Sequence, residues 1–351
     1  MSPSLRFPEF TGEWEYFSIN DVCSEFKSGK NIKADLISSN GDFPVYGGNG
    51  LRGYTSSYNH DGLYVLIGRQ GALCGNVRSV FGKIYITEHA IAVAGNEKSD
   101  TNFLHYLFLK MNLGQYSDQS AQPGLAVNKL LKLKVLLPSI SEQIKIAKLL
   151  SLLDERIAVQ SRLIDRLQSL MKGIRHRIIN EAKGKIVCLC EVSDIYQPQT
   201  ISSADLTETG YPVYGANGII GHYTSYNHEA EQVCITCRGN TCGGVNYTKS
   251  KSWITGNAMV VNVDRYQNIV SKRYLYHYLS NCDFNSIISG SGQPQIVRAP
   301  LAKFKIILPT VMQQYKIAHC LDVIQNKINV NSNILNLLIR QKQYLLRKMF
   351  I

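Results

Sequence analysis

The sequence predicts an α+β fold of two homologous β-rich domains, each followed by a long α-helix, the helices pairing as an antiparallel coiled coil with pseudo-two-fold symmetry. Three observations lead to this prediction: a domain-sized internal repeat, a change from strand-like to helix-like sequence in each repeat, and a shared heptad in the helical segments. The length of 351 residues agrees, because a single hydrophobic core stops growing at roughly 250 to 300 residues.

The internal repeat is visible without gaps in one stretch. Residues 43–60, FPVYGGNGLRGYTSSYNH, align with residues 211–228, YPVYGANGIIGHYTSYNH, at an offset of 168, and eleven of the eighteen positions are identical. Three additional residues then enter the second copy, and LLPSISEQIKIAKLL (136–150) aligns with ILPTVMQQYKIAHCL (307–321) at an offset of 171. A period near 170 residues is that of a whole domain and is too long for a solenoid repeat.

Within each copy the sequence changes character once. The first part has short β-branched and aromatic runs, such as LYVLIG and KIYIT, separated by Gly, Asn and Ser clusters, which is typical of strands joined by turns. A long helix follows in both copies, and Pro138-Ser139 and Pro309-Thr310 are favourable first residues for it. We therefore expect domains at 1–137 and 184–308, a central helix at 138–183 and a C-terminal helix at 309–351.

Both helical segments carry the same heptad, with apolar residues at alternating spacings of three and four. A period of 3.5 that persists over four heptads favours a coiled coil over the alternative, in which each helix packs only on its own domain. Each buried Leu or Ile contributes about 1.5–3 kcal/mol, so the seam is expected to hold the two copies together. The expected pairing residues are Leu150, Leu153, Ile157, Ile164, Leu167 and Ile174 in the first helix and Leu321, Ile324, Ile328, Leu335, Leu338 and Leu345 in the second.

The charge of the chain favours a polyanionic partner. Lys and Arg outnumber Asp and Glu by 38 to 26, which gives a net charge of +12 at pH 7. Nucleic acid is the first candidate for such a partner, and an ordinary basic protein is the alternative. The sequence has no export signal and no run of about 18 apolar residues, so we expect a cytoplasmic protein without membrane contact. The nine cysteines form no disulfide framework, which indicates reduced thiols.

The motifs that usually carry catalysis are missing from the sequence. It contains no Pro-Pro pair of an adenine methyltransferase loop, no P-loop, no H-E-x-x-H and no G-x-S-x-G. Gly48, Gly50 and Gly53 have the spacing of a dinucleotide-binding loop, but YTSSYNH follows them instead of a helix, and Ala216 replaces the first glycine in the second copy. We therefore expect no catalytic residue and no cofactor.

A cysteine cluster in the second copy raises the question of zinc. Cys234 and Cys237 have the C-x-x-C spacing of metal ligands, and Cys242 follows them. The first copy keeps only Cys74 of this cluster. We therefore interpret the cluster as structural thiols and expect no bound metal.

The chain resembles the specificity subunit of type I restriction-modification enzymes. The resemblance rests on PVYGGNG and PVYGANG, on LIGRQG and ITCRGN, and on QPGLAVNKLLKLKVLLPSISEQIKIAKLL and its counterpart GQPQIVRAPLAKFKIILPTVMQQYKIAHCL, and it extends over essentially the whole chain. It implies two target-recognition domains, each of which reads one half of a bipartite asymmetric site in double-stranded DNA. One departure is Gln313, which stands where the family commonly has an acidic residue.

The resemblance also implies a role for the helices and for other chains. The helices set the spacing of the two domains and dock methyltransferase subunits, of which two are expected, while restriction and motor subunits join the full complex. From Leu150 to Ile178 the helical seam is about 43 Å long at 1.5 Å per residue. This length is sufficient to hold two readers about one DNA turn, roughly 34–36 Å, apart.

Candidate DNA-contacting residues lie in matched loops of the two copies. Arg suits guanine, and Asn or Gln suits adenine. Residues that differ between the copies are the better candidates for discriminating bases, and Arg52 against Ile220 and Gln70 against Gly239 are two such pairs. The full set comprises Tyr46, Asn49, Arg52, Arg69, Gln70 and Gln122 in the first copy and Tyr214, Asn217, Arg238, Asn240 and Gln293 in the second.

Two other functions are compatible with the sequence. The first, from the class of binding scaffolds, is a two-headed adaptor whose domains bind proteins or glycans. The second is an enzyme that binds a nucleotide at the glycine loop of residues 48–53.

Overall fold

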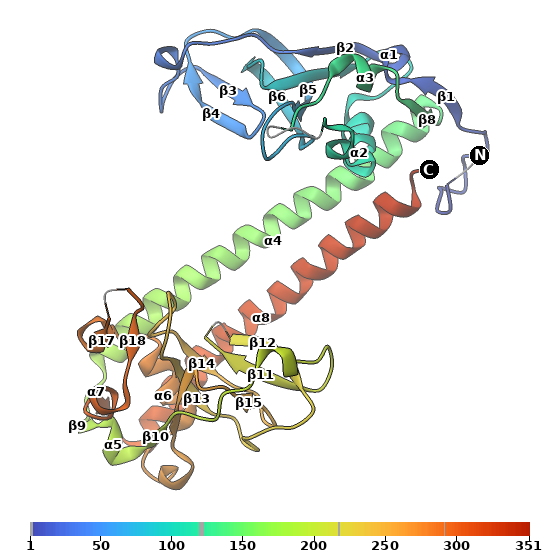
Figure 1. Ribbon diagram of the computed structural model, residues 1–351. Helices are drawn as coiled ribbons and strands as arrows, with labels where there is room; N and C mark the ends of the chain where they lie inside the picture. Colours follow the sequence, from blue (N-terminus) through green and yellow to red (C-terminus); the bar gives the residue numbers. More distant parts are fainter. Residues whose placement is uncertain (1–2, 119–122, 217, 291) are drawn as a thin grey trace. The chain divides into compact units, whose positions relative to one another are not determined.

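The computed structural model describes residues 3–118, 123–216, 218–290 and 292–351, and the chain divides into two compact units (Figure 1). Unit 1 consists of Met1–Ser161 and Asn333–Ile351, and unit 2 of Arg162–Ser332. Each unit contains one β-rich domain, part of helix α4 (Ile140–Glu181) and part of helix α8 (Val311–Lys348). The predicted α+β fold, with two β-rich domains and two long helices, is confirmed.

The described residues of unit 1 form a six-stranded sheet in the order β2-β7-β5-β6-β3-β4. Its longest pair, β5 and β6, is antiparallel, with His60 opposite Ile84 and Ile67 opposite Val77. The far end of β6 turns to pair in parallel with β3, where Tyr46 lies opposite Ile86. A second, two-stranded sheet joins β1 and β8 just before α4 begins. The strands are β1 (Glu15–Ser18), β2 (Cys23–Ser28), β3 (Phe43–Gly47), β4 (Gly50–Thr55), β5 (His60–Gly68), β6 (Val77–Ile86), β7 (Ala90–Gly95) and β8 (Lys134–Leu137).

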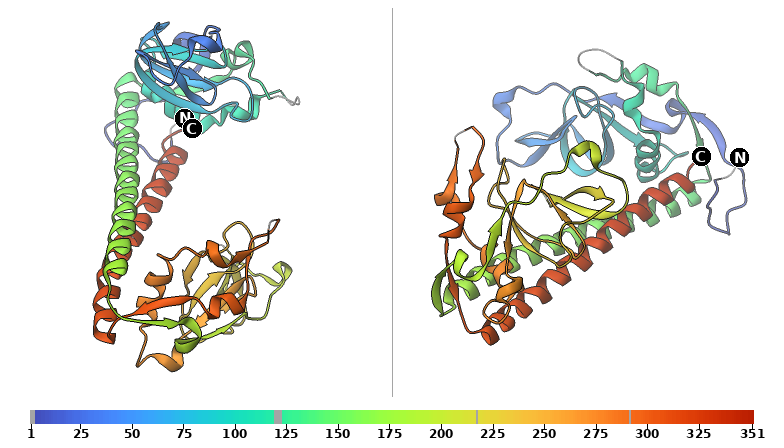
Figure 2. Two further views of the ribbon diagram at one scale, coloured as in Figure 1. Left: turned by 90° about the vertical axis from the view of Figure 1, so that its left-hand side faces the viewer. Right: turned by 60° about the horizontal axis from the view of Figure 1, so that its bottom comes forward.

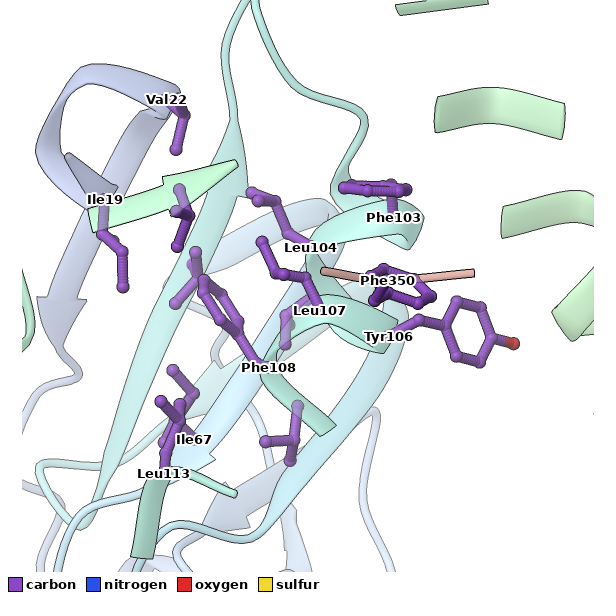
Figure 3. Close-up of a cluster of buried hydrophobic side chains, with 14 of the residues drawn as sticks. Ile19, Val22, Ile67, Phe103, Leu104, Tyr106, Leu107, Phe108, Leu113 and Phe350 are labelled. Atoms are coloured by element: carbon purple, nitrogen blue, oxygen red, sulfur yellow. The ribbon is translucent and has the colours of Figure 1, made fainter. Parts of the chain in front are cut away.

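Helix α2 (Thr101–Met111) is the centre of the core of unit 1. Its first residue follows Asp100, whose carboxylate accepts a hydrogen bond from the backbone N–H of Phe103. Phe103 is fully buried, and the ring of Phe350 stacks on it with the centroids 5.1 Å apart (Figure 3). The residues that follow α8 therefore belong to the core of the first domain. The short helices of this unit are α1 (Ile19–Val22), α3 (Val127–Leu131) and the 3₁₀ turns η1 (Ala34–Leu36) and η2 (Leu113–Tyr116).

Unit 2 repeats this sheet, but in its described residues the sheet is divided into two parts, β10-β16-β13-β14 and β12-β11-β15. The division follows from one strand, because the segment that matches β6 is broken at residues 248–252, where Lys251 has a left-handed φ of 49°. β15 keeps the parallel pairing with β11 that β6 makes with β3. The strands are β9 (Lys185–Cys188), β10 (Asp194–Tyr196), β11 (Tyr211–Gly215), β12 (Gly218–Tyr223), β13 (Val233–Thr236), β14 (Val245–Tyr247), β15 (Trp253–Ile254), β16 (Ala258–Asn262), β17 (Ile288–Ser289), β18 (Gln295–Ile296) and β19 (Lys305–Leu308).

Helix α6 (Lys272–Leu279) has the place in unit 2 that α2 has in unit 1. The Ser271 hydroxyl caps it, and Tyr274 and Leu275 are fully buried in the core. Ile179 of α4 and Ala318 of α8 are part of the same core. The remaining elements are α5 (Leu189–Val192), α7 (Arg298–Ala302), η3 (Ser203–Asp205), η4 (Asp264–Tyr266) and η5 (Asn285–Ile287).

The two long helices run side by side and antiparallel within each unit (Figure 2). In unit 1 the first half of α4 lies beside the second half of α8, and the Lys342 ammonium contacts the Asp154 carboxylate at 2.6 Å. In unit 2 the second half of α4 lies beside the first half of α8. All twelve apolar residues expected from the heptad are buried or half-buried. Leu150 lies in the core of the first domain and Leu345 packs against that core, and the pairing of the twelve residues with one another stays a prediction.

One glutamine attaches each long helix to its domain. Gln143, fully buried, accepts a hydrogen bond from the Asp100 backbone N–H and donates to the carbonyl groups of Lys98 and Pro138. Gln314 makes the equivalent three bonds to Ser271, Ile269 and Pro309. The start of each helix is therefore held by the same network in both units. Among the residues described, no helix combines the length and the apolar character that a membrane span requires.

Candidate nucleic-acid interface

The glycine-rich stretch of unit 1 is the hairpin that joins β3 and β4. Gly50 and Gly53 have φ values of 101° and 149°, which favour glycine. The turn reaches close to the next loop, because a Cβ on Gly48 would lie 2.7 Å from the carbonyl oxygen of His89. A strand follows the turn where a dinucleotide loop would open a helix, so the hypothesis of a nucleotide enzyme at this loop loses its structural basis.

A hollow of about 260 Å³ lies beside this turn and gathers several of the expected side chains. Asn49, Arg52 and Gln70 line it together with His89, which the sequence reasoning missed. Nδ1 of His89 lies 3.1 Å from Oε1 of Gln70. The side chains that line the hollow therefore include both hydrogen-bond donors and acceptors.

Two arginines cover the glycines of the turn. A Cβ on Gly47 would lie 2.8 Å from Cδ of Arg52, and one on Gly50 would lie 3.0 Å from Cζ of Arg78. Both side chains are exposed, and within the described part of the chain neither pairs with a carboxylate. Arg78 is a second residue that the sequence reasoning missed. Unpaired guanidinium groups at a turn are suited to contacts with phosphates or base edges.

The loop after β5 is held by backbone hydrogen bonds to the segment before β7 and to residues 123–125. The N–H of Arg69 donates to the His89 carbonyl oxygen at 2.9 Å, and that of Gly71 donates to Pro123 at 3.0 Å. Arg69 accepts in turn from Leu125 at 2.9 Å. The position of Gln70 in the hollow is therefore fixed by its neighbours on both sides.

The same backbone hydrogen bonds recur in unit 2 around other side chains, and we call this shared set of bonds and the glycine turn beside it the backbone framework. The N–H of Cys237 donates to Asn257 and that of Gly239 to Pro294, both at 3.0 Å. Cys237 accepts from Ile296, also at 3.0 Å. These bonds match those of Arg69, Gly71 and Leu125 one for one.

This match corrects one pairing made from the sequence. Gln70 corresponds to Arg238, not to Gly239, because Gly71 and Gly239 share a left-handed φ of 82° and 85°. In the corrected alignment LIGRQG (66–71) lies opposite CITCRG (234–239), so the two arginines are one position apart.

The framework positions differ in chemistry between the units. Ile220 packs over Gly215 as Arg52 packs over Gly47, with a Cβ on Gly215 lying 2.9 Å from Cδ1 of Ile220. Asn246 takes the place of Arg78 on the strand that matches β6. Asn257 takes the place of His89. Comparing VRSV with VNYT in the aligned copies is the signal by which Arg78 and Asn246 are found in the sequence.

The two tyrosines of the matched PVYG segments lie in the scaffold. Tyr214 is 6% exposed, and its hydroxyl accepts a hydrogen bond from the Lys249 backbone N–H at 3.1 Å. Burial raises the pKa of this hydroxyl. Tyr46 is half-buried against the cluster that contains Leu66 and Ile86. These placements favour a role in the shape of the turn over direct contact with a base.

The other expected contacts divide into exposed residues and residues outside the description. Arg238, Asn240 and Gln293 are exposed in unit 2. Gln122 and Asn217 lie outside the described residues. The contacts of all these side chains with DNA stay predictions.

The repeated Tyr-Asn-His motif is part of the scaffold. Asn59 exchanges two hydrogen bonds with the backbone of Ile86, at 2.9 and 2.8 Å, and Asn227 does the same with Ile254, at 3.0 and 2.9 Å. Nδ1 of His60 and of His228 lies 2.6 Å from the amide oxygen of the preceding asparagine. The motif therefore fixes the strand that leads to the framework, which explains its presence in both copies.

The cysteine cluster of unit 2 is divided between two sides of the sheet. Cys234 belongs to the small cluster with Tyr214, whereas Cys237 lies in the main core. Burial raises the pKa of the Cys234 thiol to about 12. Among the residues described, no group of three or more His, Cys, Asp or Glu side chains is arranged to hold a metal ion.

A family model described as the type I restriction modification DNA specificity domain matches the chain twice, over residues 11–169 and 182–340. The chain belongs to this family. The specificity subunit of the EcoprrI type I restriction enzyme of Escherichia coli is 45% identical over 154 residues, which are 43% of this chain and 38% of that protein. The chain thus matches about two fifths of the length of that relative.

Other members of this specificity family match over nearly the whole chain. A Haemophilus influenzae protein named as type I restriction enzyme specificity subunit S.HindORF215P is 23% identical over 94% of this chain and 92% of its own length. The crystal structure of the S subunit of a type I restriction-modification system from M. genitalium superimposes with a TM-score of 0.79 at 18% identity, covering 100% of this chain and 99% of that one. A structure described under complex assembly of the type I R-M system gives a TM-score of 0.56 at 16% identity, covering 98% and 99% of the two chains. These structural matches establish a shared fold.

Proposed function

We propose that this chain is the non-catalytic DNA-reading subunit of a type I restriction-modification complex, and that each domain reads one half of a bipartite asymmetric site. The observation that carries the proposal is the repeated framework, in which the same backbone presents Arg52 and Arg78 in one unit and Ile220 and Asn246 in the other. Two readers that share a framework and differ at its exposed positions recognise different sequences.

The charges around the framework support DNA as the ligand. The chain carries a net charge of +12, and Arg52, Arg78 and Arg238 have no carboxylate partner among the described residues. Cations that neutralise phosphates bind DNA without regard to sequence, whereas side chains in the grooves provide specificity. We propose that the protein acts in the cytoplasm, where host and invading DNA are accessible.

We also propose that the helices dock two methyltransferase subunits and set the spacing of the domains in a pseudo-two-fold arrangement, with restriction and motor subunits completing the complex. Each helix has a second apolar row in addition to the coiled-coil seam. The side chains of Val159 and Val330, which match at an offset of 171, are 56% and 57% exposed. Exposed apolar rows of this kind are typical of interfaces with partner helices. The matched pairs of the row are Ile144 and Tyr315, Leu152 and Val323, Val159 and Val330, and Leu163 and Ile334.

Sequencing of N6-methyladenine in genomic DNA tests the proposed function. The gene is expressed with the methyltransferase subunit of its own system, and the methylome is compared with that of a strain that lacks the gene. We expect one bipartite motif, two short sequences separated by a fixed spacer, only when the gene is present. An unchanged methylome despite expression of both subunits would contradict the proposal, and binding of a protein or glycan in that case would favour the adaptor.

Substitutions on the second apolar row test the docking. We expect Val159→Asp and Val330→Asp each to weaken copurification of the methyltransferase subunit strongly while the melting temperature stays unchanged, because both side chains are exposed. Ser169→Asp places the same charge at another exposed position of α4 and is the control. Full copurification of both valine variants would show that the row is not the docking surface.

A further inference from the structure

Two positions beside the glycine turn carry the same two chemical groups in opposite order in the two units. The first position is Gln70 in unit 1 and Arg238 in unit 2, and the second is Arg78 in unit 1 and Asn246 in unit 2. Each unit thus has one carboxamide and one guanidinium at this place, but their positions are exchanged.

The backbone establishes that the first position is equivalent in the two units. Gln70 and Arg238 each precede a glycine with left-handed φ, and each forms an isolated β-bridge to the segment that follows the shared Gln-Pro. The bridge partners are Gly124 and Gln295. Both side chains are exposed at the same point of the same loop.

The strand register establishes the second position. Arg78 lies opposite Leu66 in the β5–β6 pair, and Asn246 lies opposite Cys234 in the β13–β14 pair, which is the same pair 168 residues later. Both side chains reach the glycine that begins the second strand of the hairpin, Gly50 in unit 1 and Gly218 in unit 2. A Cβ on Gly50 would lie 3.0 Å from Cζ of Arg78, and one on Gly218 would lie 3.7 Å from Oδ1 of Asn246.

These groups are available to a ligand. Within the described residues neither guanidinium pairs with a carboxylate, and the Asn246 side chain has no hydrogen-bond partner. Among the described residues the Gln70 amide contacts His89 alone, with its Oε1 3.1 Å from Nδ1, and this contact leaves its NH₂ group and a second lone pair on the oxygen. These few contacts give none of the four polar groups a structural role in the fold. Their equivalent positions and exchanged chemistry in the two units therefore require another explanation.

We infer that the two positions determine the sequence each unit reads: unit 1 reads adenine through Gln70 and guanine through Arg78, and unit 2 reads guanine through Arg238 and adenine through Asn246. A guanidinium forms two parallel bonds with O6 and N7 of guanine, and a carboxamide forms two with N6 and N7 of adenine. The inference rests on the proposed DNA-reading function and adds which base each position selects. The two half-sites then have adenine and guanine at exchanged places relative to their domains.

A swap of the two groups within one unit tests the inference. The full chain with Gln70→Arg and Arg78→Asn together is expressed with its methyltransferase subunit, and the methylated motif is sequenced. We expect two bases to change in one half-site, adenine to guanine and guanine to adenine, while the other half-site and the spacer stay the same. The preference at each position is expected to shift by about 5- to 150-fold. The reciprocal pair Arg238→Gln and Asn246→Arg is expected to change only the other half-site.

The conservative variant Arg78→Lys distinguishes base reading from a phosphate contact. Lysine keeps the charge but loses the planar fork, so we expect relaxed selection at one guanine with the rest of the motif retained. A swap variant that methylates the wild-type motif would overturn the inference and leave the proposed function standing. If the swap abolishes methylation, Arg78→Lys decides, and undiminished guanine selection in it overturns the inference. Absence of any bipartite motif with the wild-type chain would instead overturn the proposed function.

Discussion

Glu142 and Gln313 occupy the same place at the start of α4 and α8, yet the acid is fully buried and the amide is exposed. In unit 1, Arg6 donates two hydrogen bonds of 2.7 Å to the Glu142 carboxylate. In unit 2, Gln313 accepts a bond from the Thr310 hydroxyl at 3.0 Å and remains at the surface. The difference arises because residues 3–13 cover the start of α4, where Lys145 pairs with Glu9.

A second difference concerns the polar side chain by which α2 in unit 1 and α6 in unit 2 contact a long helix. In unit 1 the Tyr106 hydroxyl donates to Asp154 of α4 at 2.9 Å, and Lys342 of α8 contacts the same carboxylate. In unit 2 His277 has the place of Tyr106, and its Nε2 lies 2.7 Å from Asp322 of α8. The repeat therefore preserves the backbone framework and the buried Gln143 and Gln314 networks, whereas the surrounding polar pairs have diverged.

The largest expected difference between the units comes from Arg6→Ala. Removing this arginine leaves the buried Glu142 carboxylate without its partner, so we expect unit 1 to lose about 3–5 kcal/mol of stability. Hydrogen exchange resolved by unit measures the effect, with unit 2 of the same chain as internal reference. Gln313→Ala removes only an exposed helix-start contact and is expected to cost unit 2 about 1 kcal/mol. Equal losses in the two variants would contradict the difference argued from burial.

The next effect in size is a dependence on pH that His277 gives to unit 2. Burial lowers the pKa of His277 to about 4; Arg175 and Arg273 lower it as well, and Asp322 opposes them. The unfolded chain therefore binds more protons between pH 6.5 and 4 than the folded unit does. The contribution of neutral His277 to the free energy of unfolding is fully present above pH 6.5. It decreases by roughly 2–3 kcal/mol as the pH falls toward 4.

His277→Tyr places the residue of unit 1 at this position and removes the titrating group. We expect the acid-induced loss of stability of unit 2 between pH 6.5 and 4.5 to become smaller, as measured by hydrogen exchange corrected for the intrinsic rate. Unit 1 keeps its own half-buried His105, whose pKa is lowered to about 4 by desolvation, and is the reference in the same chain. An unchanged acid sensitivity of unit 2 would contradict the role of His277.

The sequence predicted the repeat, the β-rich domains and the helices, because an offset alignment and a heptad depend only on residue order. It also selected Asn49, Arg52 and Gln70, which meet at one hollow. Arg78 and His89 were not predicted. Arg78 lies near the turn because β3 pairs with β6, and His89 lies near it because the loop before β7 packs against Gly48.

The pairing of Gln70 with Gly239 failed for a different reason. It matched the arginines of LIGRQG and ITCRGN by residue identity, whereas the offset of 168 that aligns residues 43–60 with 211–228 pairs Gln70 with Arg238 and Gly71 with Gly239, and the left-handed φ of both glycines agrees with that offset. The burial of Glu142 was hidden, because it depends on the segment around Arg6, 136 residues away in the chain. Long-range contacts of this kind are what a single sequence does not provide.

The smallest expected difference concerns how each unit closes its glycine turn. In unit 1 two glycines meet, and a Cβ on Gly68 would lie 2.8 Å from the Gly48 carbonyl oxygen. In unit 2 the buried Thr236 hydroxyl donates to the matching Ala216 carbonyl at 2.6 Å, and Thr241 donates to the same oxygen at 3.2 Å. We expect Thr236→Val to cost unit 2 about 1 kcal/mol, because the shape is kept, one hydrogen bond is lost and the second donor remains. Thr236→Ser keeps the hydroxyl and is the control. If serine destabilises unit 2 as much as valine does in thermal melting, packing of the methyl group holds the turn, and the hydroxyl is not the substitute for the glycine pair of unit 1.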